Sequence, residues 1–176
     1  YSLSPYNAIR LVLGKQMPKD TKTDNRYTRA KDFFTQWQKE KILIQEKKPS
    51  LYYHEHIYAV GDHTYTRRGI IASVQLDDGD KKNIRPHEYT QKGPKLDRLR
   101  LMNEVRMNFS SVFGIYSDPK KVVELKVRPA LGNPVVEFDI NRESHRLWII
   151  TDEAVIEQIT KLLHNKKVLI ADGHHR

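Results

Sequence analysis

Two β-prone runs joined by a Gly-Asp pair constrain the fold of this chain more than any other feature. Residues Leu51–Val60 and Thr64–Leu76 flank Gly61-Asp62, a dipeptide suited to a tight hairpin turn. From residue 70 onward the second run alternates between two sets of side chains, as a strand does: Ile70, Ala72, Val74 and Leu76 on one side, and Ile71, Ser73 and Gln75 on the other. We therefore expect a long antiparallel hairpin, and an all-helical fold is excluded.

Helical spacing of apolar residues marks three other segments. In Asn25–Lys41 the aromatic residues recur every three or four positions, which places them on one stripe of a core-facing helix. The spacing from Leu96 to Val105 predicts a second helix. Asp152 is suited to cap a third helix, whose apolar residues run to Leu163.

Shorter apolar runs predict the remaining strands and complete the fold class. They are Ala8–Leu13, Ser111–Tyr116, Val135–Ile140, His145–Ile150 and Val168–Ala171. Residues 77–82 predict a polar turn, and residues 85–97 predict a loop without strand or helix period. The sum is an α+β fold with a mainly antiparallel sheet and flanking helices. We expect residues 1–176 to form one domain or a fragment of one, and residues 118–134 leave a subdivision open.

The charge balance and the missing cysteines narrow the classes of function. Lys and Arg number 31 against 22 Asp and Glu, and the net charge of +9 favours anionic partners such as nucleotides, nucleic acids or acidic metabolites. The absence of Cys excludes disulfides, thiolate metal sites and a Cys nucleophile. No apolar run reaches the length of a membrane span and no basic-apolar leader opens the sequence, so we expect a cytoplasmic protein without a membrane partner. Because the sequence starts at Tyr1 and stops at Arg176, directly behind a strand pattern, we expect an internal fragment of a longer protein.

The strongest local signal for chemistry is the stretch ADGHHR at residues 171–176. Gly173 lets backbone N–H groups approach an anion, and Arg176 can bind phosphate or carboxylate through two hydrogen bonds. Asp172 is suited to bind Mg²⁺ or act as a base, and His174 or His175 could donate a proton or stabilise charge in the transition state. The alternative is that Asp172 caps a following helix and both histidines are surface loop residues.

A second polar stretch occupies residues 85–98. His87 and Glu88 could serve as a base and the group that orients it, or as metal ligands. Lys95 or Arg98 could neutralise a phosphate, and Asp97 is a further candidate base. The alternative for Asp97 and Arg98 is that they are charges in the first turn of a helix.

Two charged features of the hairpin have structural alternatives. Arg68 falls on the apolar face of its strand, where a guanidinium needs a ligand or an acidic partner, such as Glu88 or Asp97. His54 and His56 point to one side of a strand and could hold a metal, but without a third ligand the favoured explanation is an exposed amphipathic face, which Tyr52 and Tyr58 share. We expect Arg68, residues 85–98 and residues 172–176 to converge on one pocket.

Five sequence blocks, taken in order, carry a family resemblance. They are PYNAIRL (5–11), TRRGIIA (66–72), RPHEYTQKGPKLDRL (85–99), HRLW (145–148) and IADGHHR (170–176). With these blocks the chain resembles the family known as domain of unknown function 1015. The final block also looks like the phosphate-binding strand-loop-helix element of the ParB and sulfiredoxin-like superfamily, which includes nucleotide hydrolases, sulfiredoxins and free-serine kinases.

The second resemblance implies a phosphate site with two kinds of residue. Nucleotide phosphate would be bound by Gly173, His174, His175 and Arg176, while a carboxylate among Glu88, Asp97 and Asp172 would act as base or Mg²⁺ ligand. The leading hypothesis is an enzyme that transfers or hydrolyses a phosphoryl group of a nucleotide or other phosphorylated small molecule. The alternatives are a ParB-like nucleic-acid-binding module and a metal-dependent hydrolase that uses His87, Glu88, Asp172 and His174.

Overall fold

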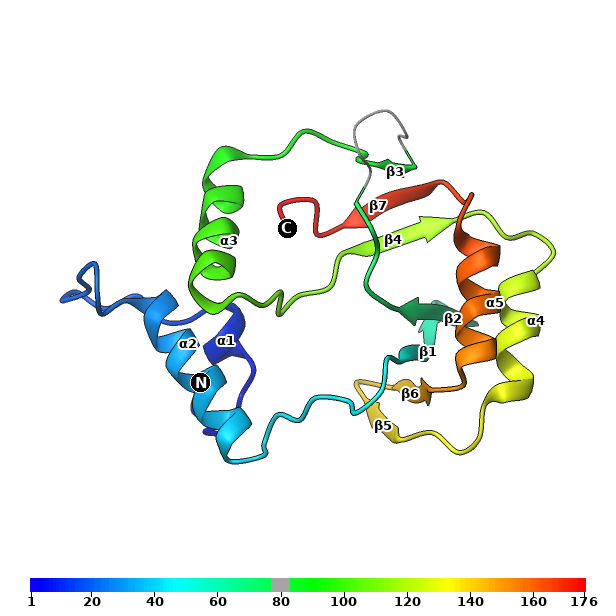
Figure 1. Cartoon of the computed structure of the whole chain (residues 1–176), viewed down its shortest axis with the longest axis horizontal. Coiled ribbons are helices and arrows are strands. Elements are labelled where there is room, and N and C mark those ends of the chain that lie inside the picture. The colour runs from blue at the N-terminus through cyan, green and yellow to red at the C-terminus, as the bar shows by residue number, and fades with distance from the viewer. Residues whose placement is uncertain (77–82) are drawn as a thin grey trace. The chain divides into compact units, whose positions relative to one another are not determined.

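The computed structural model of the chain describes residues 1–76 and 83–176 (Figure 1). Its helices are α1 (Ile9–Val12), α2 (Arg26–Lys39), α3 (Lys92–Val105), α4 (Val122–Val127), the 3₁₀ turn η1 (Arg128–Ala130) and α5 (Glu153–Leu163). Its strands are β1 (Leu51–Val60), β2 (His63–Ile71), β3 (Ile84–Arg85), β4 (Phe113–Tyr116), β5 (Val136–Ile140), β6 (Glu143–Ile150) and β7 (Val168–Asp172). The predicted α+β class with a mainly antiparallel sheet is confirmed. The predicted turn at residues 77–82 lies outside the described residues.

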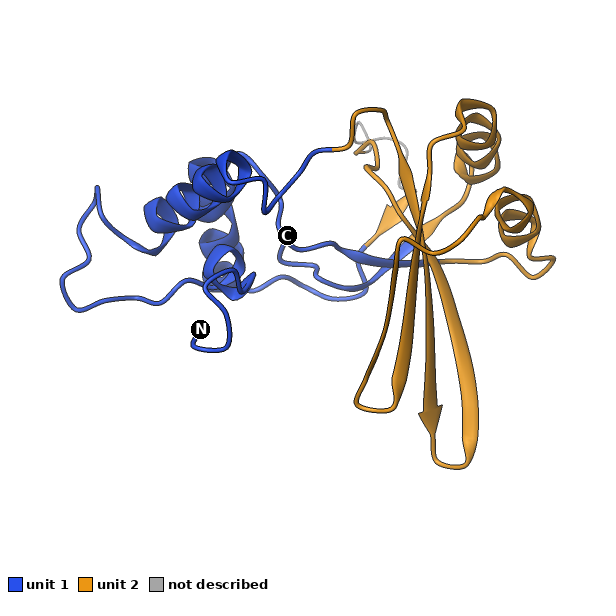
Figure 2. Ribbon diagram, turned by 90° about the horizontal axis from the view of Figure 1, so that it is seen from below, with its two compact units in different colours: residues 1–45, 86–115, 169–176 blue, residues 46–85, 116–168 orange. Residues whose placement is uncertain are grey.

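The elements form two compact units, each assembled from separate stretches of the chain (Figure 2). Unit 1 consists of residues 1–45, 86–115 and 169–176, and unit 2 consists of residues 46–85 and 116–168. A small sheet has the strand order β3-β7-β4. Among the described residues, no helix combines the length and the apolar composition that crossing a membrane requires.

Unit 2 is built on a four-stranded sheet of order β2-β1-β6-β5. In β1, Tyr53 lies opposite Ile70 of β2 and opposite Trp148 of β6. Because side chains alternate between the faces of a strand, these residues share one face, which packs against α4 and α5. The buried residues of this core are Tyr53, Val123, Val127, Ile150 and Ile159.

Unit 1 contains three helices, of which α2 is fixed at its start by a capping box. The Asn25 side chain accepts hydrogen bonds from the first-turn amides, and the Thr28 hydroxyl accepts one from the Asn25 amide at 2.9 Å. Further along α2, Ala30 packs against Leu101 and Val105 of α3 in a second buried cluster. The predicted core-facing helix is therefore confirmed.

The prediction of a strand at Ala8–Leu13 is wrong, because residues 9–12 form the short helix α1. The Asn7 side chain accepts a hydrogen bond from the amide of residue 9 at 3.0 Å, and the amides of residues 11 and 12 both donate to the Ala8 carbonyl. Leu11 is thereby buried. A short apolar run fits a helical turn as well as a strand, and here the polar cap decides between them.

The predicted loop at residues 85–97 is also only partly a loop, because α3 begins at Lys92. Pro94 falls in the first turn, where a missing N–H removes no intrahelical hydrogen bond. The amide of Lys95 then donates to the Gln91 carbonyl at 3.3 Å. The first residues of α3 include Gly93 and Pro94 and no apolar residue at helical spacing, so the sequence pattern does not indicate that the helix has begun.

The second hairpin strand is shorter than the predicted Thr64–Leu76, since β2 ends at Ile71. In the antiparallel register Ile71 lies opposite Tyr52, one residue from the start of β1. Beyond that point β1 offers no backbone partner, so the alternation that continues in the sequence does not extend the ladder.

Candidate functional site

The turn after β7 depends on a glycine. Gly173 is buried and has φ +80°, a backbone conformation that side-chain-bearing residues rarely adopt. A Cβ at this position would collide with Nη1 of Arg176 and would lie 3.3 Å from Cα of Val112. The Arg176 amide donates to the Gly173 carbonyl at 3.0 Å and closes the turn. The guanidinium of Arg176 is thus folded back over the glycine, and no carboxylate within the described residues pairs with it.

Three side chains from the two predicted polar stretches meet in unit 1. Nε2 of His174 forms an ion pair with Oε1 of Glu88, and Nε2 of His87 lies 3.8 Å from the other oxygen of Glu88. The rings of His87 and His174 stand edge to face, with centroids 5.4 Å apart. The side chains of Glu88 and His87 are 49% and 37% exposed, whereas that of His174 is only 13% exposed. We call these three residues the unit 1 cluster.

The hydrogen bonds of the unit 1 cluster define which nitrogen carries a proton. Nδ1 of His87 bonds to the backbone carbonyl of Ile170, and since a carbonyl oxygen only accepts, this nitrogen must donate. In the neutral ring, Nε2 then keeps a lone pair on the side of Glu88. Nδ1 of His174 is buried and finds no hydrogen-bond partner among the described residues. The cluster therefore offers a lone pair, a carboxylate and an unpaired ring nitrogen within a small volume.

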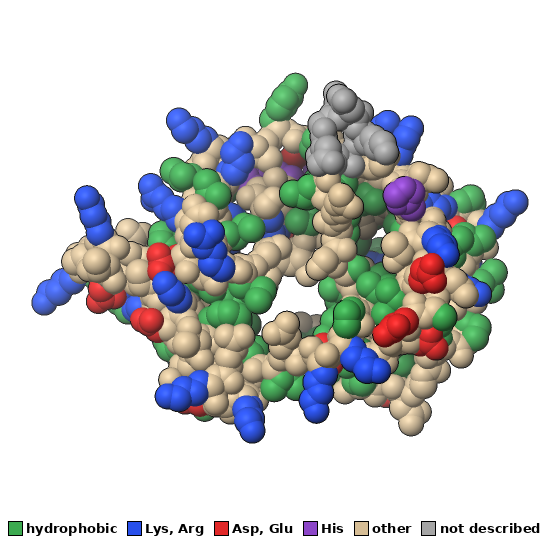
Figure 3. All heavy atoms as spheres, viewed as in Figure 1, with side chains coloured by type: hydrophobic (Ala, Val, Ile, Leu, Met, Phe, Trp, Pro, Cys, Tyr) green, Lys and Arg blue, Asp and Glu red, His purple; other side chains and the backbone are tan. Residues whose placement is uncertain are grey.

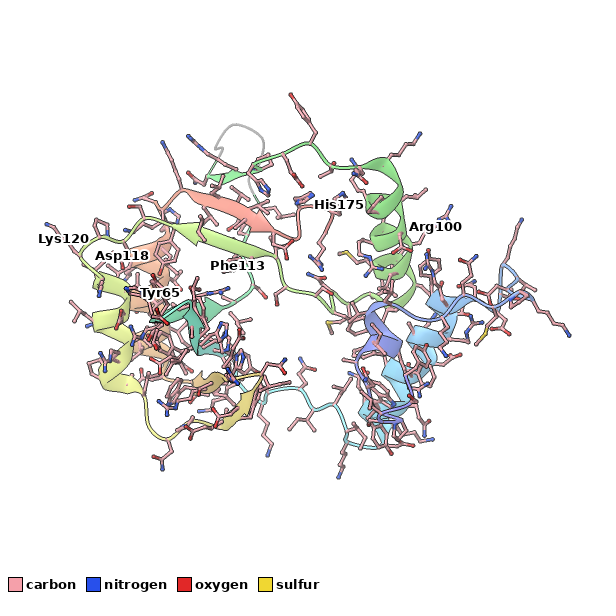
Figure 4. All side chains as sticks on the ribbon, turned by 180° about the vertical axis from the view of Figure 1, so that it is seen from behind. Tyr65, Arg100, Phe113, Asp118, Lys120 and His175 are labelled. Atoms are coloured by element: carbon pink, nitrogen blue, oxygen red, sulfur yellow. The ribbon has the colours of Figure 1, made fainter. Side chains whose placement is uncertain are left out.

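His175 ties the same turn to the start of α3 (Figure 4). Its Nε2 accepts a hydrogen bond from the backbone amide of Gln91 at 3.1 Å. Gln91 is the residue that directly precedes α3. The conformation of Gly173 therefore shapes the turn at residues 173–176, and the hydrogen bond from Gln91 to His175 attaches this turn to the start of α3.

Asp97 is surrounded by donors and connects helices α2 and α3. Its carboxylate pairs with Arg26 and Arg98, and the hydroxyl of Tyr27 donates to it at 2.7 Å. Burial acts to raise the pKa of Asp97, but the hydrogen bonds from Arg98 and Tyr27 and the two positive charges outweigh it and hold the pKa below 3.8. Arg98 also donates to the Val12 carbonyl at 2.7 Å. These contacts make Asp97 a structural link between α2 and α3. Because its carboxylate oxygens already accept hydrogen bonds from Arg26, Arg98 and Tyr27, Asp97 is poorly suited to act as a base.

The exchange Asp97→Asn is expected to lower the free energy of unfolding by about 2 kcal/mol at neutral pH, because two arginines lose their carboxylate. The folded-state pKa lies below the usual 3.8, so this stabilisation is present above pH ~4 and is lost as pH falls through the lowered value. Urea denaturation at several pH values should show the difference between the two proteins shrinking in acid. Asp32→Asn, on the exposed side of α2, is the control and should change stability by at most about 0.5 kcal/mol. A difference that stays constant across the pH range would contradict this account.

The other predicted residues lie in different surroundings. Arg68 belongs to unit 2, where its guanidinium pairs with Glu55 at 2.8 Å and Glu124 at 3.5 Å. The structural ion pair is thus formed, but its partners are not the expected Glu88 or Asp97. Lys95 lies exposed in the first turn of α3, and Asp172 lies exposed as the last residue of β7.

Two groups of residues were not anticipated from the sequence. One is the pair Arg26 and Tyr27, which lie 71 and 70 positions from their partner Asp97 and carry no local signal of that contact. The other is the pair His145 and Glu143 on unit 2, which join the expected His56: His145 lies opposite it in the sheet and Glu143 lies 2.8 Å from its Nε2. His145 is the first residue of the block HRLW. Pairing the strand that contains this block with the strand that contains His54 and His56 would have indicated that the three histidines lie close together.

Fold and site together define an α+β protein in which a carboxylate and two imidazoles meet beside a glycine turn that presents an arginine. The sequence model of one family, described as "Protein of unknown function (DUF1015)", matches residues 1–176, and the chain belongs to that family. No curated protein and no solved structure matches the chain significantly.

Proposed function

We propose that this chain is part of an enzyme that binds a nucleotide or another phosphorylated small molecule and transfers or hydrolyses a phosphoryl group. The observation that carries the proposal is the meeting of Glu88 with His174 and His87, in the same unit as the Arg176 guanidinium that has no carboxylate partner among the described residues. Phosphoryl transfer needs both kinds of group, because a base must activate the nucleophile and a cation must bind the phosphate.

Within this proposal Glu88 is the base. It is nearly half exposed and so can be reached by a substrate, whereas Asp97 is committed to Arg26, Arg98 and Tyr27. His174 lies against Glu88 and can pass on or stabilise a proton. His87 is anchored through the Ile170 carbonyl, and when protonated it can donate from Nε2 to the other oxygen of Glu88.

The phosphate half of the site is residues 173–176. Because Gly173 has no Cβ, the Arg176 guanidinium can fold back over the turn, and the exposed Arg176 side chain is the group that an anion can approach. Arg176 also lines a small hollow whose other residues are partly polar and partly apolar: Arg98, Asn108, Ser110, Leu101, Met102, Met107 and Phe109. The similarity of residues 172–176 to the phosphate-binding element of the ParB and sulfiredoxin-like superfamily supports the same assignment.

The leading proposal and a second candidate function differ in the metal ion that would assist the reaction. Mg²⁺ prefers oxygen ligands, so Asp172 and the substrate phosphates would bind it. Imidazole nitrogens suit Zn²⁺ and related ions, and the donor atoms of His87, Glu88 and His174 lie within 4.8 Å of one another. That spacing favours a metal-dependent hydrolase as the second candidate function. On the face drawn in Figure 3, Lys and Arg are scattered and do not gather into one patch, so this face gives no support to the nucleic-acid-binding alternative.

The proposal is tested by ligand binding to the intact protein. ATP, CTP and inorganic phosphate, each with and without Mg²⁺, should raise the melting temperature, and calorimetry should give the affinities. Loss of a charge-assisted contact to phosphate predicts that Arg176→Ala weakens binding about 10- to 100-fold. Arg100→Ala, an exposed arginine of α3, is the matched control and should bind as the unchanged protein does.

Two results would overturn the proposal. One is that none of these phosphate compounds binds, and the other is that Arg176→Ala binds them undiminished. Binding of DNA that falls steeply with added salt would instead support the nucleic-acid-binding module. Turnover that requires Zn²⁺ and is unaffected by Mg²⁺ would support the metal-dependent hydrolase.

A further inference from the structure

Three histidines and a glutamate gather on the second face of the unit 2 sheet, opposite to the face that packs on α4 and α5. His56 of β1 lies directly opposite His145 of β6 in the antiparallel register. His54 and Glu143 lie two residues away on their own strands, and residues two apart on a strand share a face. Four side chains that commonly bind metals thus project from adjacent strands toward one side.

The distances between the donor atoms suit a metal ion. Nε2 of His56 lies 2.8 Å and Nε2 of His145 lies 3.9 Å from the same oxygen of Glu143. In a tetrahedral zinc site with bonds of about 2.0–2.2 Å, ligand atoms are roughly 3.3–3.6 Å apart. The two observed distances bracket this range, and the near-parallel rings of His56 and His145 must rotate out of their stacked arrangement for both nitrogens to point at one ion.

The two rings are largely buried, whereas the carboxylate beside them is open to solvent. The side chains of His56 and His145 are only 12% and 19% exposed, while that of Glu143 is 43% exposed. The two rings stack at 4.3 Å, and Phe138 stacks on His145 at 4.9 Å. Nε2 of His54 lies 3.2 Å from Nδ1 of His145, so the second ring nitrogen of His145 has a hydrogen-bond partner, as that of a metal-bound histidine does.

We infer that this face of unit 2 binds a transition-metal dication, Zn²⁺ in the first instance, through His56, His145 and Glu143. His54 is a positioning residue that holds the His145 ring, and the fourth coordination position faces solvent. Two imidazoles and one carboxylate favour Zn²⁺, Co²⁺ or Ni²⁺ over Mg²⁺ or Ca²⁺, which require mostly oxygen ligands. The site draws no residue from the unit 1 cluster, so it does not depend on the proposed function.

The test uses the full chain with His87→Gln and His174→Gln, so that the unit 1 cluster contributes no imidazole ligand. Metal-free protein of this background should bind one equivalent of Zn²⁺ by calorimetry and should rise in melting temperature with Zn²⁺. With Co²⁺ it should give the visible absorption of a four- or five-coordinate ion. Adding His56→Gln or Glu143→Gln should weaken Zn²⁺ binding at least 100-fold, and adding His54→Gln should weaken it about 10-fold.

His63→Gln is the control, since His63 is an exposed histidine at the start of β2 and lies outside the cluster. This variant should bind Zn²⁺ as its background does. Glu143→Gln keeps the stacked rings, so its effect separates lost coordination from lost folding. The inference is overturned if the background binds no Zn²⁺, or if it binds Zn²⁺ equally well after His56→Gln and after Glu143→Gln.

Discussion

Glu88→Gln is expected to lower the turnover of the intact protein about 10²- to 10⁴-fold, with the affinity for the phosphorylated substrate nearly unchanged. The amide is almost isosteric with the carboxylate and can still contact His174, so the local geometry is retained. What is lost is the proton acceptor, which acts in the transition state and contributes little to substrate binding. Turnover is therefore expected to fall while KM stays within a few-fold.

Steady-state kinetics with the substrate found by the binding screen measures this effect. Glu104→Gln is the matched control, because Glu104 is a carboxylate of α3 whose partner is Lys31 and it lies outside the unit 1 cluster. Its turnover should equal that of the unchanged protein. Undiminished turnover in Glu88→Gln would remove Glu88 as the base, and the same exchange at Asp172 and Asp97 would then show which carboxylate takes that role.

The second large effect is expected in the core of unit 2. Ile159 of α5 is 0% exposed and belongs to the same buried cluster as Tyr53, Val127 and Ile150. Ile159→Ala removes buried carbon atoms and leaves a cavity between α5 and the sheet. Such exchanges lower the free energy of unfolding by about 2–5 kcal/mol, and the complete burial of this side chain places the expected loss at about 3–4 kcal/mol.

Urea denaturation followed by circular dichroism measures this loss. Leu125→Ala in α4 is the control, because the Leu125 side chain is 66% exposed, and it should change stability by no more than about 0.5 kcal/mol. Equal destabilisation by the two exchanges would mean that α5 does not close the core in the way the structure describes.

Elements whose own residues encode them could be predicted from the sequence. The hairpin around Gly61-Asp62 and the helix behind Asp152 both formed as expected, and the Asp152 side chain accepts hydrogen bonds from the amides of residues 154 and 155. Period and cap are local signals that survive in any surroundings. For Ala8–Leu13 and for the start of α3, the deciding groups were single polar residues and a first-turn proline, which change the backbone without changing the apolar pattern.

Contacts between distant residues were predictable only in part. The polar stretches that contain His87, Glu88 and His174 were expected to meet, and they do. The expected ion pair of Arg68 with Glu88 or Asp97 was wrong, because Arg68 pairs with Glu55 and Glu124. The charge of Arg68 predicts that it needs a carboxylate, but it does not predict which carboxylate the strand register brings close. Glu55 lies directly opposite Arg68 in the hairpin, a pairing that could have been counted from the turn.

The segmented build of unit 1 has a consequence for the order in which the molecule is completed during synthesis. His87 and the Ile170 carbonyl that anchors it are 83 positions apart, and the ribosome adds about 5–20 residues per second. Roughly 4 to 17 seconds therefore separate the two halves of the cluster, and the helices and strands of residues 116–168 emerge in the interval. A nascent chain can already carry its long hairpin while Glu88 still has no imidazole from residue 174 beside it. Within residues 1–176, the unit 1 cluster is therefore completed only after the helices and strands of residues 116–168 have been synthesised.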